Sequence, residues 1–220
     1  LPQGESFPTL SVIVPACNEA ETIEPALVSL LASDYPSLEV LLIDDRSNDE
    51  TGVIMDRIAE SDPRVRVLHI TDLPPGWLGK VHAMHQGTSK VSGDFILYTD
   101  ADVHFGAGTL QRAVAWMQRE DLGHLALIPR LVGRSLAYNT TISCFAVAYL
   151  IAVKAWRVGK SGSEAYGGVG AFSMIRRTAF DRTPGWEWLK MEVGDDIGLG
   201  MMMVREGQAR SALGLASECL

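Results

Sequence analysis

The stretch Thr99–Asp102 places two carboxylates one residue apart, directly after a run of strand-forming residues. Phe95 to Tyr98 are apolar or aromatic, which is typical of a strand buried on both faces of a parallel sheet. In an open α/β sheet, the carboxyl ends of the strands face the ligand crevice. Asp100 and Asp102 could there hold a hard divalent cation, Mg²⁺ or Mn²⁺, against a phosphate group. Taken alone, so short an acid pair favours a plainer role in the turn before the next helix.

Acidic residues also follow two other predicted strands. The strand Leu10–Ala16 is followed by Glu19, and the strand Glu39–Asp45 ends on Asp44 and Asp45. Turn and capping roles are common at any one such position. Three acidic strand ends that meet at the same edge of a parallel sheet are harder to explain in this way. Acids at a phosphate site repel the ligand unless a cation lies between them, so the charges themselves imply a metal.

One lysine is well placed to bind a diphosphate. Lys80 follows Gly79 at the start of a predicted helix, where its charge would add to the positive end of the helix dipole. A solvated surface lysine fits the local sequence equally well. No G-x-G-x-x-G follows the first strand and no G-x-x-x-x-G-K-[ST] occurs, which disfavours a dinucleotide site and a Walker-type loop.

Strands and helices alternate through the first 120 residues. We predict strands at 10–16, 39–45, 64–70 and 95–98, and helices at 18–32, 51–60, 80–90 and 108–120. This alternation predicts right-handed crossovers and a mostly parallel sheet. The third strand alternates with a period of two, which indicates a position near an edge. Asn18 is the predicted N-cap of the first helix.

The second half of the chain is less regular. We predict strands at 124–128, 171–175 and 210–213, and helices at 136–158 and 195–206. No linker separates the halves, so residues 1–220 are expected to form one domain.

Composition excludes several classes of protein. The chain has 220 residues, of which 47% are hydrophobic, and its formal net charge of −8 argues against nucleic acid as a partner. Three widely spaced cysteines predict neither a disulfide framework nor a zinc site, and favour a reducing compartment. No stretch reaches the roughly 18–20 apolar residues that span a bilayer. The first residue is Leu, so we expect an excised part of a longer protein.

A basic, apolar segment stands out in this acidic chain. Residues 122–163 contain no Asp or Glu, and Ile142 to Val153 is interrupted only by Ser143. Such a segment could lie on a membrane surface with its cations toward anionic head groups, or form a buried core helix. The cations of the segment are Arg130, Arg134, Lys154, Arg157 and Lys160.

Four motifs in this order resemble glycosyltransferase family 2. They are P-A-x-N-E at 15–19, I-D-D-x-S-x-D-x-T at 43–51, G-W-L-G-K-x-x-A-M-x-x-G at 76–87 and T-D-A-D at 99–102. The resemblance implies a GT-A fold, with a Rossmann-like, mostly parallel sheet flanked by helices. It also implies a nucleotide-diphosphate sugar as donor, usually a UDP-sugar, with Mg²⁺ or Mn²⁺. Residues 73–87 followed by T-D-A-D-V look most like a bacterial branch that acts on lipid acceptors, including carotenoid- and hopanoid-associated members.

The resemblance also assigns roles to individual positions. The residues that match positions around the donor are Pro15, Glu19 and Asp45 near the nucleoside, Lys80 near the diphosphate, and Asp100 and Asp102 facing ribose, diphosphate and metal. Among these, Asp102 is the expected direct metal ligand. Gly168 lies in a segment similar to the family's glycine-rich loop, where glycine lets the backbone approach a sugar closely.

The stretch 193–200 resembles the family's E-D-x-x-L-G pattern, in which the second acid is the catalytic base. This match points to Asp196, with Asp195 in place of the usual Glu. Transfer requires such a group, because the acceptor hydroxyl must lose its proton as it attacks the anomeric carbon. Capping of the following helix by both acids is compatible with this role.

We therefore expect an inverting glycosyltransferase acting on a lipid-like hydroxyl or carboxylate acceptor at the cytoplasmic face of the cell membrane. Residues 1–120 would form its nucleotide-binding half and 121–220 its acceptor-side half. Lipid-directed relatives continue beyond the point that corresponds to Leu220, so this chain is expected to bind donor better than it transfers sugar. One alternative is a sugar-nucleotide nucleotidyltransferase, but residues 16–20 lack the glycine- and Arg/Lys-rich loop that it needs. Another is a non-catalytic membrane-associated protein with a vestigial nucleotide site.

Overall fold

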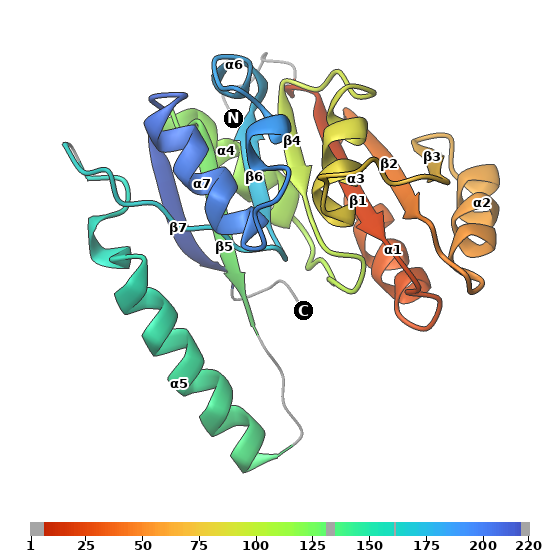
Figure 1. Cartoon of the computed structure of the whole chain (residues 1–220), viewed down its shortest axis with the longest axis horizontal. Helices are drawn as coiled ribbons and strands as arrows, with labels where there is room; N and C mark the ends of the chain where they lie inside the picture. Colours follow the sequence, from red (N-terminus) through yellow and green to blue (C-terminus); the bar gives the residue numbers. More distant parts are fainter. Residues whose placement is uncertain (1–6, 131–134, 161, 217–220) are drawn as a thin grey trace.

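A computed structural model describes residues 7–130, 135–160 and 162–216 (Figure 1). Its seven-stranded sheet has the order β3-β2-β1-β4-β6-β5-β7. The strands are β1 (Leu10–Ala16), β2 (Leu38–Asp45), β3 (Val65–Ile70), β4 (Phe95–Tyr98), β5 (His124–Pro129), β6 (Ser173–Arg176) and β7 (Ser211–Ala216). Among these strands β6 alone runs opposite to its neighbours. The predicted mostly parallel α/β sheet, with the third strand at an edge, is confirmed.

Helices cover both faces of the sheet. They are α1 (Ile23–Leu31), α2 (Thr51–Ser61), α3 (Gly79–Thr88), α4 (Thr109–Arg119), α5 (Leu136–Ala152), α6 (Arg177–Phe180) and α7 (Asp195–Arg205), with 3₁₀ turns η1 (Ala155–Arg157) and η2 (Trp186–Leu189). Successive β1 side chains enter different cores, since Val12 and Val14 pack with α1, α2 and α4 while Ile13 packs with α3, η2 and α7. A strand buried on both faces explains the continuous apolar run of β1.

Strand register brings the acidic strand ends together. Ala16 of β1 lies opposite Asp44 of β2, and Tyr98 of β4 lies opposite Ile13. The backbone N–H of Thr99 donates to the carbonyl of Ile13, so the chain leaves β4 beside β1. The predicted convergence at one sheet edge is therefore present.

Two predictions about helices are wrong. Asn18 does not cap the first helix, which begins at Ile23 with Thr22 as N-cap. Asn18 has a left-handed φ of 58° and accepts a hydrogen bond from the backbone N–H of Asn48 at 2.7 Å, so it joins two loops instead. The helix predicted at 136–158 ends at Ala152 and is followed by η1. Pattern alone did not predict α6 and η2.

α5 stands off from the sheet, as Figure 1 shows. None of its residues is buried, although most are apolar. The alternative of a buried core helix is therefore wrong. In the part of the chain that the structure describes, no helix is long and apolar enough to cross a membrane. Arg134, one of the cations of the basic segment, lies outside the described residues.

Candidate active site

A cleft of about 340 Å³ opens at the carboxyl ends of β1, β2 and β4. It is lined by Pro15, Ala16, Cys17, Glu19, Asp45, Lys80, Asp100, Ala101 and Asp102. Six of the residues singled out in the sequence thus share one cleft. Their roles toward a ligand stay predictions, but their proximity is a property of the fold.

Hydrogen bonds between two loops fix the wall of this cleft. The backbone N–H of Glu19 donates to Thr51 Oγ1 at 2.8 Å. Asp49 accepts from the N–H of Ala20 at 3.2 Å and from the Thr51 hydroxyl at 2.6 Å. Asp44 accepts from the N–H of Ser47, which is turn chemistry as the plainer interpretation holds. Much of the I-D-D-x-S-x-D-x-T motif therefore shapes the wall.

Asp45 is a buried carboxylate already engaged on both oxygens. Arg46 donates from Nε to Oδ1 at 2.8 Å and from Nη2 to Oδ2 at 3.0 Å. These hydrogen bonds raise the pKa of Arg46 above its ordinary value. Gly79, at the start of α3, lies so close that a Cβ there would be 2.5 Å from Asp45 Oδ2. Glycine at this position lets α3 begin against the Asp45–Arg46 pair.

Lys80 connects the acids at the strand ends with those of α7. Its Nζ lies 2.6 Å from Asp100 Oδ1 and 3.7 Å from Asp195 Oδ2. Burial lowers the pKa of Lys80, but the negative charges of Asp100 and Asp195 outweigh burial and raise the pKa above its ordinary value. Lys80 therefore stays a cation at neutral pH, held where the two sides of the site meet.

Asp102 is the carboxylate best placed for a metal. It is exposed in the cleft, and within the described residues its carboxylate makes no hydrogen bond or ion pair. Those residues include no group of three or more His, Cys, Asp or Glu side chains that could hold a metal unaided. Mg²⁺ and ions like it are commonly bound by one or two carboxylates plus substrate phosphates and water. The donor set fits an ion shared with a diphosphate.

Asp195 and Asp196 begin α7 on the opposite side of Lys80. Asp196 accepts hydrogen bonds from the backbone N–H groups of Gly170 at 3.0 Å and Ile197 at 2.8 Å. Burial raises the pKa of Asp195, Lys80 opposes this, and the charge of Asp196 adds to it. One narrow recess is lined by Lys80 and by both α7 acids, so the candidate base adjoins the cleft at the strand ends.

Two glycines of the loop before β6 have different neighbours. A Cβ on Gly168 would lie 1.9 Å from the carbonyl oxygen of Asp196, whereas a Cβ on Gly170 would lie 2.8 Å from Asp100 Oδ2. The Tyr149 hydroxyl of α5 donates to the carbonyl of Gly168 at 2.6 Å and accepts from its N–H at 3.1 Å. The absence of a side chain at Gly168 thus lets the loop pack against the start of α7. A contact between Gly168 and a donor stays a prediction. Gly170 belongs to the same glycine-rich loop, and although the sequence assigned it no individual role, it borders the carboxylates.

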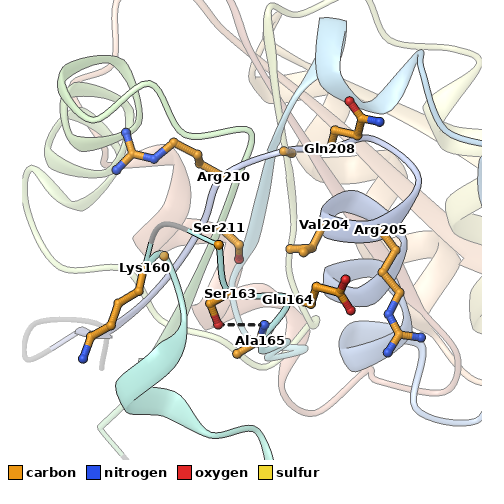
Figure 2. Close-up of a pocket in the computed structure, with 12 residues that line it drawn as sticks. Lys160, Ser163, Glu164, Ala165, Val204, Arg205, Gln208, Arg210 and Ser211 are labelled. Atoms are coloured by element: carbon orange, nitrogen blue, oxygen red, sulfur yellow. Dashed lines mark hydrogen bonds between the residues drawn. The ribbon is translucent and has the colours of Figure 1, made fainter.

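A larger cavity, of about 760 Å³, lies away from these acids (Figure 2). It is formed by residues 159–160 and 162–165, the end of α7 and the start of β7. Figure 2 shows the cationic ends of Lys160 and Arg210 pointing away from one another. The larger cavity is therefore not the candidate active site. The candidate site is the smaller cleft, which is recognised by the charged side chains that converge on it.

Comparison with known protein families identifies the family of this chain. A sequence profile of glycosyl transferase family 2 matches residues 11–183. The chain belongs to this family. The matched range includes the donor cleft and Gly170, and it ends before the candidate base.

Some relatives in this family act on lipids according to their names. The chain is 28% identical over 196 residues to the β-monoglucosyldiacylglycerol synthase of Trichormus variabilis, covering 88% of this chain and 41% of the relative. It is 29% identical over 118 residues to the GalNAc(5)-diNAcBac-PP-undecaprenol β-1,3-glucosyltransferase of Campylobacter jejuni, covering 54% of this chain and 36% of the relative. The chain thus spans less than half the length of these curated relatives.

Solved structures confirm the predicted GT-A fold. A mannosyltransferase from Pyrobaculum calidifontis, in complex with GDP-mannose and Mn²⁺, superposes with a TM-score of 0.73 and 26% identity over 97% of this chain and 56% of that one. Glucosyl-3-phosphoglycerate synthase from Mycobacterium tuberculosis, with Mn²⁺ and UDP-glucose, has a TM-score of 0.65 and 20% identity over 97% of this chain and 71% of that one.

Proposed function

We propose that this chain is the glycosyltransferase module of a metal-dependent, inverting enzyme. It moves a sugar from a nucleotide-diphosphate sugar, most simply a UDP-sugar, to a lipid-like acceptor. One observation carries the proposal: Lys80 lies between Asp100 on the donor side and Asp195 on the acceptor side. Complexes of the structural neighbours with nucleotide sugars and Mn²⁺ support the donor class. The names of the relatives support the lipid acceptor.

Residues 1–120 bind the donor in this proposal. The nucleoside is surrounded by Pro15, Glu19 and Asp45. Lys80, which is hydrogen-bonded to Asp100, also interacts with the diphosphate of the donor. Asp102 holds the divalent cation, Mg²⁺ or Mn²⁺, which when bound neutralises charge on the leaving diphosphate. Without a cation, the acids of the cleft would repel the donor.

Residues 121–220 present the acceptor. Asp196 accepts the proton of the acceptor hydroxyl as that oxygen attacks the anomeric carbon, from the face opposite the leaving diphosphate. Attack from that face inverts the anomeric configuration. The N–H groups of Gly170 and Ile197 hold the carboxylate of Asp196 in a fixed orientation, so the proton acceptor is pre-positioned.

We also assign the module to the membrane surface, at the cytoplasmic face. The lipid names of the relatives and the acid-free basic segment 122–163 support this assignment. All 220 residues would act as one domain. A nucleotidyltransferase is less consistent with the cleft, because Lys80 is the sole Lys or Arg among the cleft-lining residues.

Two charge-removing variants separate donor binding from proton transfer. Calorimetry should show UDP binding to the wild type in the presence of Mn²⁺ and its loss on chelation. Asp102→Asn should weaken the Mn²⁺-dependent binding of UDP by about tenfold or more, which corresponds to about 1.4 kcal/mol. Asp196→Asn should leave UDP binding intact but slow sugar transfer to diacylglycerol micelles by about 10²–10⁴-fold, because it removes a general base. UDP-glucose and GDP-mannose are the donors to test.

Glu187→Gln is the matched control, because it removes an exposed acid of η2 that neither lines the cleft nor touches Asp196. It should match the wild type in both measurements. Metal-independent UDP binding, or none, would favour the non-catalytic alternative. Transfer by Asp196→Asn near the wild-type rate would show that another group removes the proton.

A further inference from the structure

Another cavity, of about 560 Å³, lies at the C-terminal end of α5 and is called the basic cavity below. Three cations, Lys154, Arg157 and Arg205, line it, against a single acid, Glu164. This excess of positive charge occurs in a chain whose formal net charge is −8. The donor cleft has the opposite character, with four acids and one lysine. The two cavities are therefore suited to ligands of different charge.

One part of the lining of this basic cavity is apolar. Ala152 and Val153 from the end of α5 face it, as does Ile197 of α7. The guanidinium of Arg205 lies over the ring of Tyr166, with Cζ 5.5 Å from the ring centroid. A planar guanidinium held on an aromatic ring keeps its N–H groups available to an anion. An amphiphile with an anionic head group matches both kinds of wall.

The apolar wall continues along α5. The side chains of Phe145 and Ile151 are 67% and 60% exposed, and Trp156 of η1 is 58% exposed. Apolar side chains exposed on all sides of a helix are costly in water and are stabilised by an apolar phase. The cations at the end of α5 would then lie at head-group level, beside the tryptophan.

The basic cavity also adjoins the candidate base. Ile197, on its wall, directly follows Asp196. The hydroxyl of Tyr149 ties α5 to Gly168, whose backbone packs against the carbonyl of Asp196. A head group held in the cavity would therefore lie on the acceptor side of the site.

We propose that this cavity binds the phosphate head group of an anionic lipid, with the acyl chains of the lipid along α5. Arginine pairs with phosphate through two parallel N–H···O bonds, which suits Arg157 and Arg205. The placement beside the acceptor rests on the proposed function, whereas the binding itself does not. The cavity of Figure 2 shares Arg205 and residues 162–165 with this one, but its other cations, Lys160 and Arg210, diverge.

Vesicle flotation tests the head-group site directly. The chain should bind phosphatidylcholine vesicles that contain 30% phosphatidylglycerol, and should bind pure phosphatidylcholine vesicles far more weakly. One cation at an anionic membrane surface contributes about fivefold in affinity. The double variant Lys154→Gln/Arg157→Gln should therefore lose roughly 25-fold in affinity for the anionic vesicles. Both side chains are exposed, so the fold should be retained.

The matched control is Lys90→Gln/Arg119→Gln, which removes two exposed cations outside the cavity and changes the net charge equally. It should bind anionic vesicles within about twofold of the wild type. Equal losses in both double variants would show that diffuse surface charge, and not this cavity, attracts the membrane, and would overturn the proposal.

Calorimetry with soluble ligands separates the two sources of phosphate. Dioctanoyl phosphatidylglycerol, below its micelle concentration, should bind at least tenfold more tightly than inorganic phosphate. Equal binding of the two would mean a site for free phosphate and would overturn the lipid assignment. UDP binding with Mn²⁺, measured on the same variants, should stay unchanged. Its absence in the wild type would contradict the proposed function while leaving the head-group site standing.

Discussion

Close backbone contacts at single glycines hold the candidate site together. Gly168 packs against the carbonyl of Asp196, and Gly200 of α7 packs against the carbonyl of Gly167, where an added Cβ would lie 2.1 Å away. Gly170 differs, since its neighbours are the side-chain ends of Asp100 and Lys80. A backbone atom cannot yield as a side chain does, so these glycines should respond differently to substitution.

Alanine substitution should separate the two kinds of contact. Gly168→Ala forces its Cβ into backbone and should lower the free energy of unfolding by about 1–3 kcal/mol or more. Gly170→Ala, at a φ that alanine adopts, displaces the Asp100 carboxylate and should leave that free energy within about 1 kcal/mol of the wild type. Its effect should fall on Mn²⁺-dependent UDP binding, weakened by about tenfold, or about 1.4 kcal/mol. Urea unfolding and calorimetry measure both, and a Gly170→Ala chain that binds UDP normally would contradict this assignment.

At this scale, sequence reasoning found the donor cleft because its acids follow strand ends. Spacing along a strand fixes which residues leave the sheet at its carboxyl edge, and so Asp45, Asp100 and Asp102 share a cleft. The pairing of Arg46 with Asp45 could not be read in the same way, because it depends on a φ of 60° at Arg46. No individual role was predicted for Gly170 of the glycine-rich loop, because its contact with Asp100 is made across the fold.

Among the elements, β5, β6 and β7 are joined by a buried histidine. His124 of β5 is fully buried and hydrogen-bonded to the hydroxyls of Ser211 in β7 at 2.8 Å and Ser173 in β6 at 3.1 Å. Burial lowers the pKa of His124 to about 4. The imidazole is therefore neutral in the folded protein, and each hydroxyl is positioned to donate to it or accept from it.

This histidine predicts a loss of stability in mild acid. The pKa of His124 is lower in the folded state than its ordinary value of 6.5, so the unfolded chain takes up the proton first as the pH falls. Stability should be intact above pH 6.5 and decline toward pH 4, by up to about 3 kcal/mol. Urea unfolding of the wild type and His124→Gln at pH 7.0, 5.5 and 4.5 measures the difference. Equal slopes in the two chains would exclude His124 as the cause.

His69 works in the opposite direction and must be allowed for. It lies 3.0 Å from both Asp44 and Asp56, and the hydrogen bond to Asp44 is the main reason that its pKa is raised. Its contribution to stability is present below pH 6.5 and is lost as the pH rises through its raised pKa. His69 contributes equally to the wild type and to His124→Gln, so its effect on stability cancels when the two are compared.

Elements with an apolar run or a clear period were predictable, and two short helical turns were not. β1 shows its burial in a continuous apolar run and α4 in apolar residues at helical spacing, so their predicted ranges were close to those observed. α6 and η2 have four residues each, which is too short for a period to show. The break after Ala152 requires Lys154 to adopt a left-handed φ of 51°, and nothing in its sequence neighbourhood indicates that.

For the whole molecule, α5 contrasts with the two packed cores. Those cores include residues of α1, α2, α3, α4 and α7, whereas no residue of α5 is buried. Most of the apolar burial that stabilises the fold therefore comes from the other elements, and the exposed apolar positions of α5 can be altered without unfolding the chain. The sequence correctly predicted an apolar helix in this segment. It did not predict where the helix lies relative to the sheet, because that depends on tertiary packing.

A triple substitution on α5 should leave stability unchanged. Phe145→Gln, Val147→Gln and Ile151→Gln replace side chains that are 67%, 57% and 60% exposed, so each should change the free energy of unfolding by no more than about 0.5 kcal/mol. Leu110→Ala, at a fully buried position of α4, should cost about 2–5 kcal/mol and serves as the contrast. Urea unfolding compares them, and a large loss from the triple variant would show that α5 packs against the body of the protein.

The reversed strand β6 has a consequence for the order of folding. The connections that join β1, β2, β3 and β4 in chain order are shorter than the connection through α5 that precedes β6, which enters the sheet between β4 and β5. Closing that long loop is entropically unfavourable, and nascent chains fold from the N-terminus. The donor cleft can thus form before β6 and α7 arrive with Gly170 and Asp196. Under the proposed function, an unfinished chain would hold a nucleotide sugar before it contains the group that activates an acceptor.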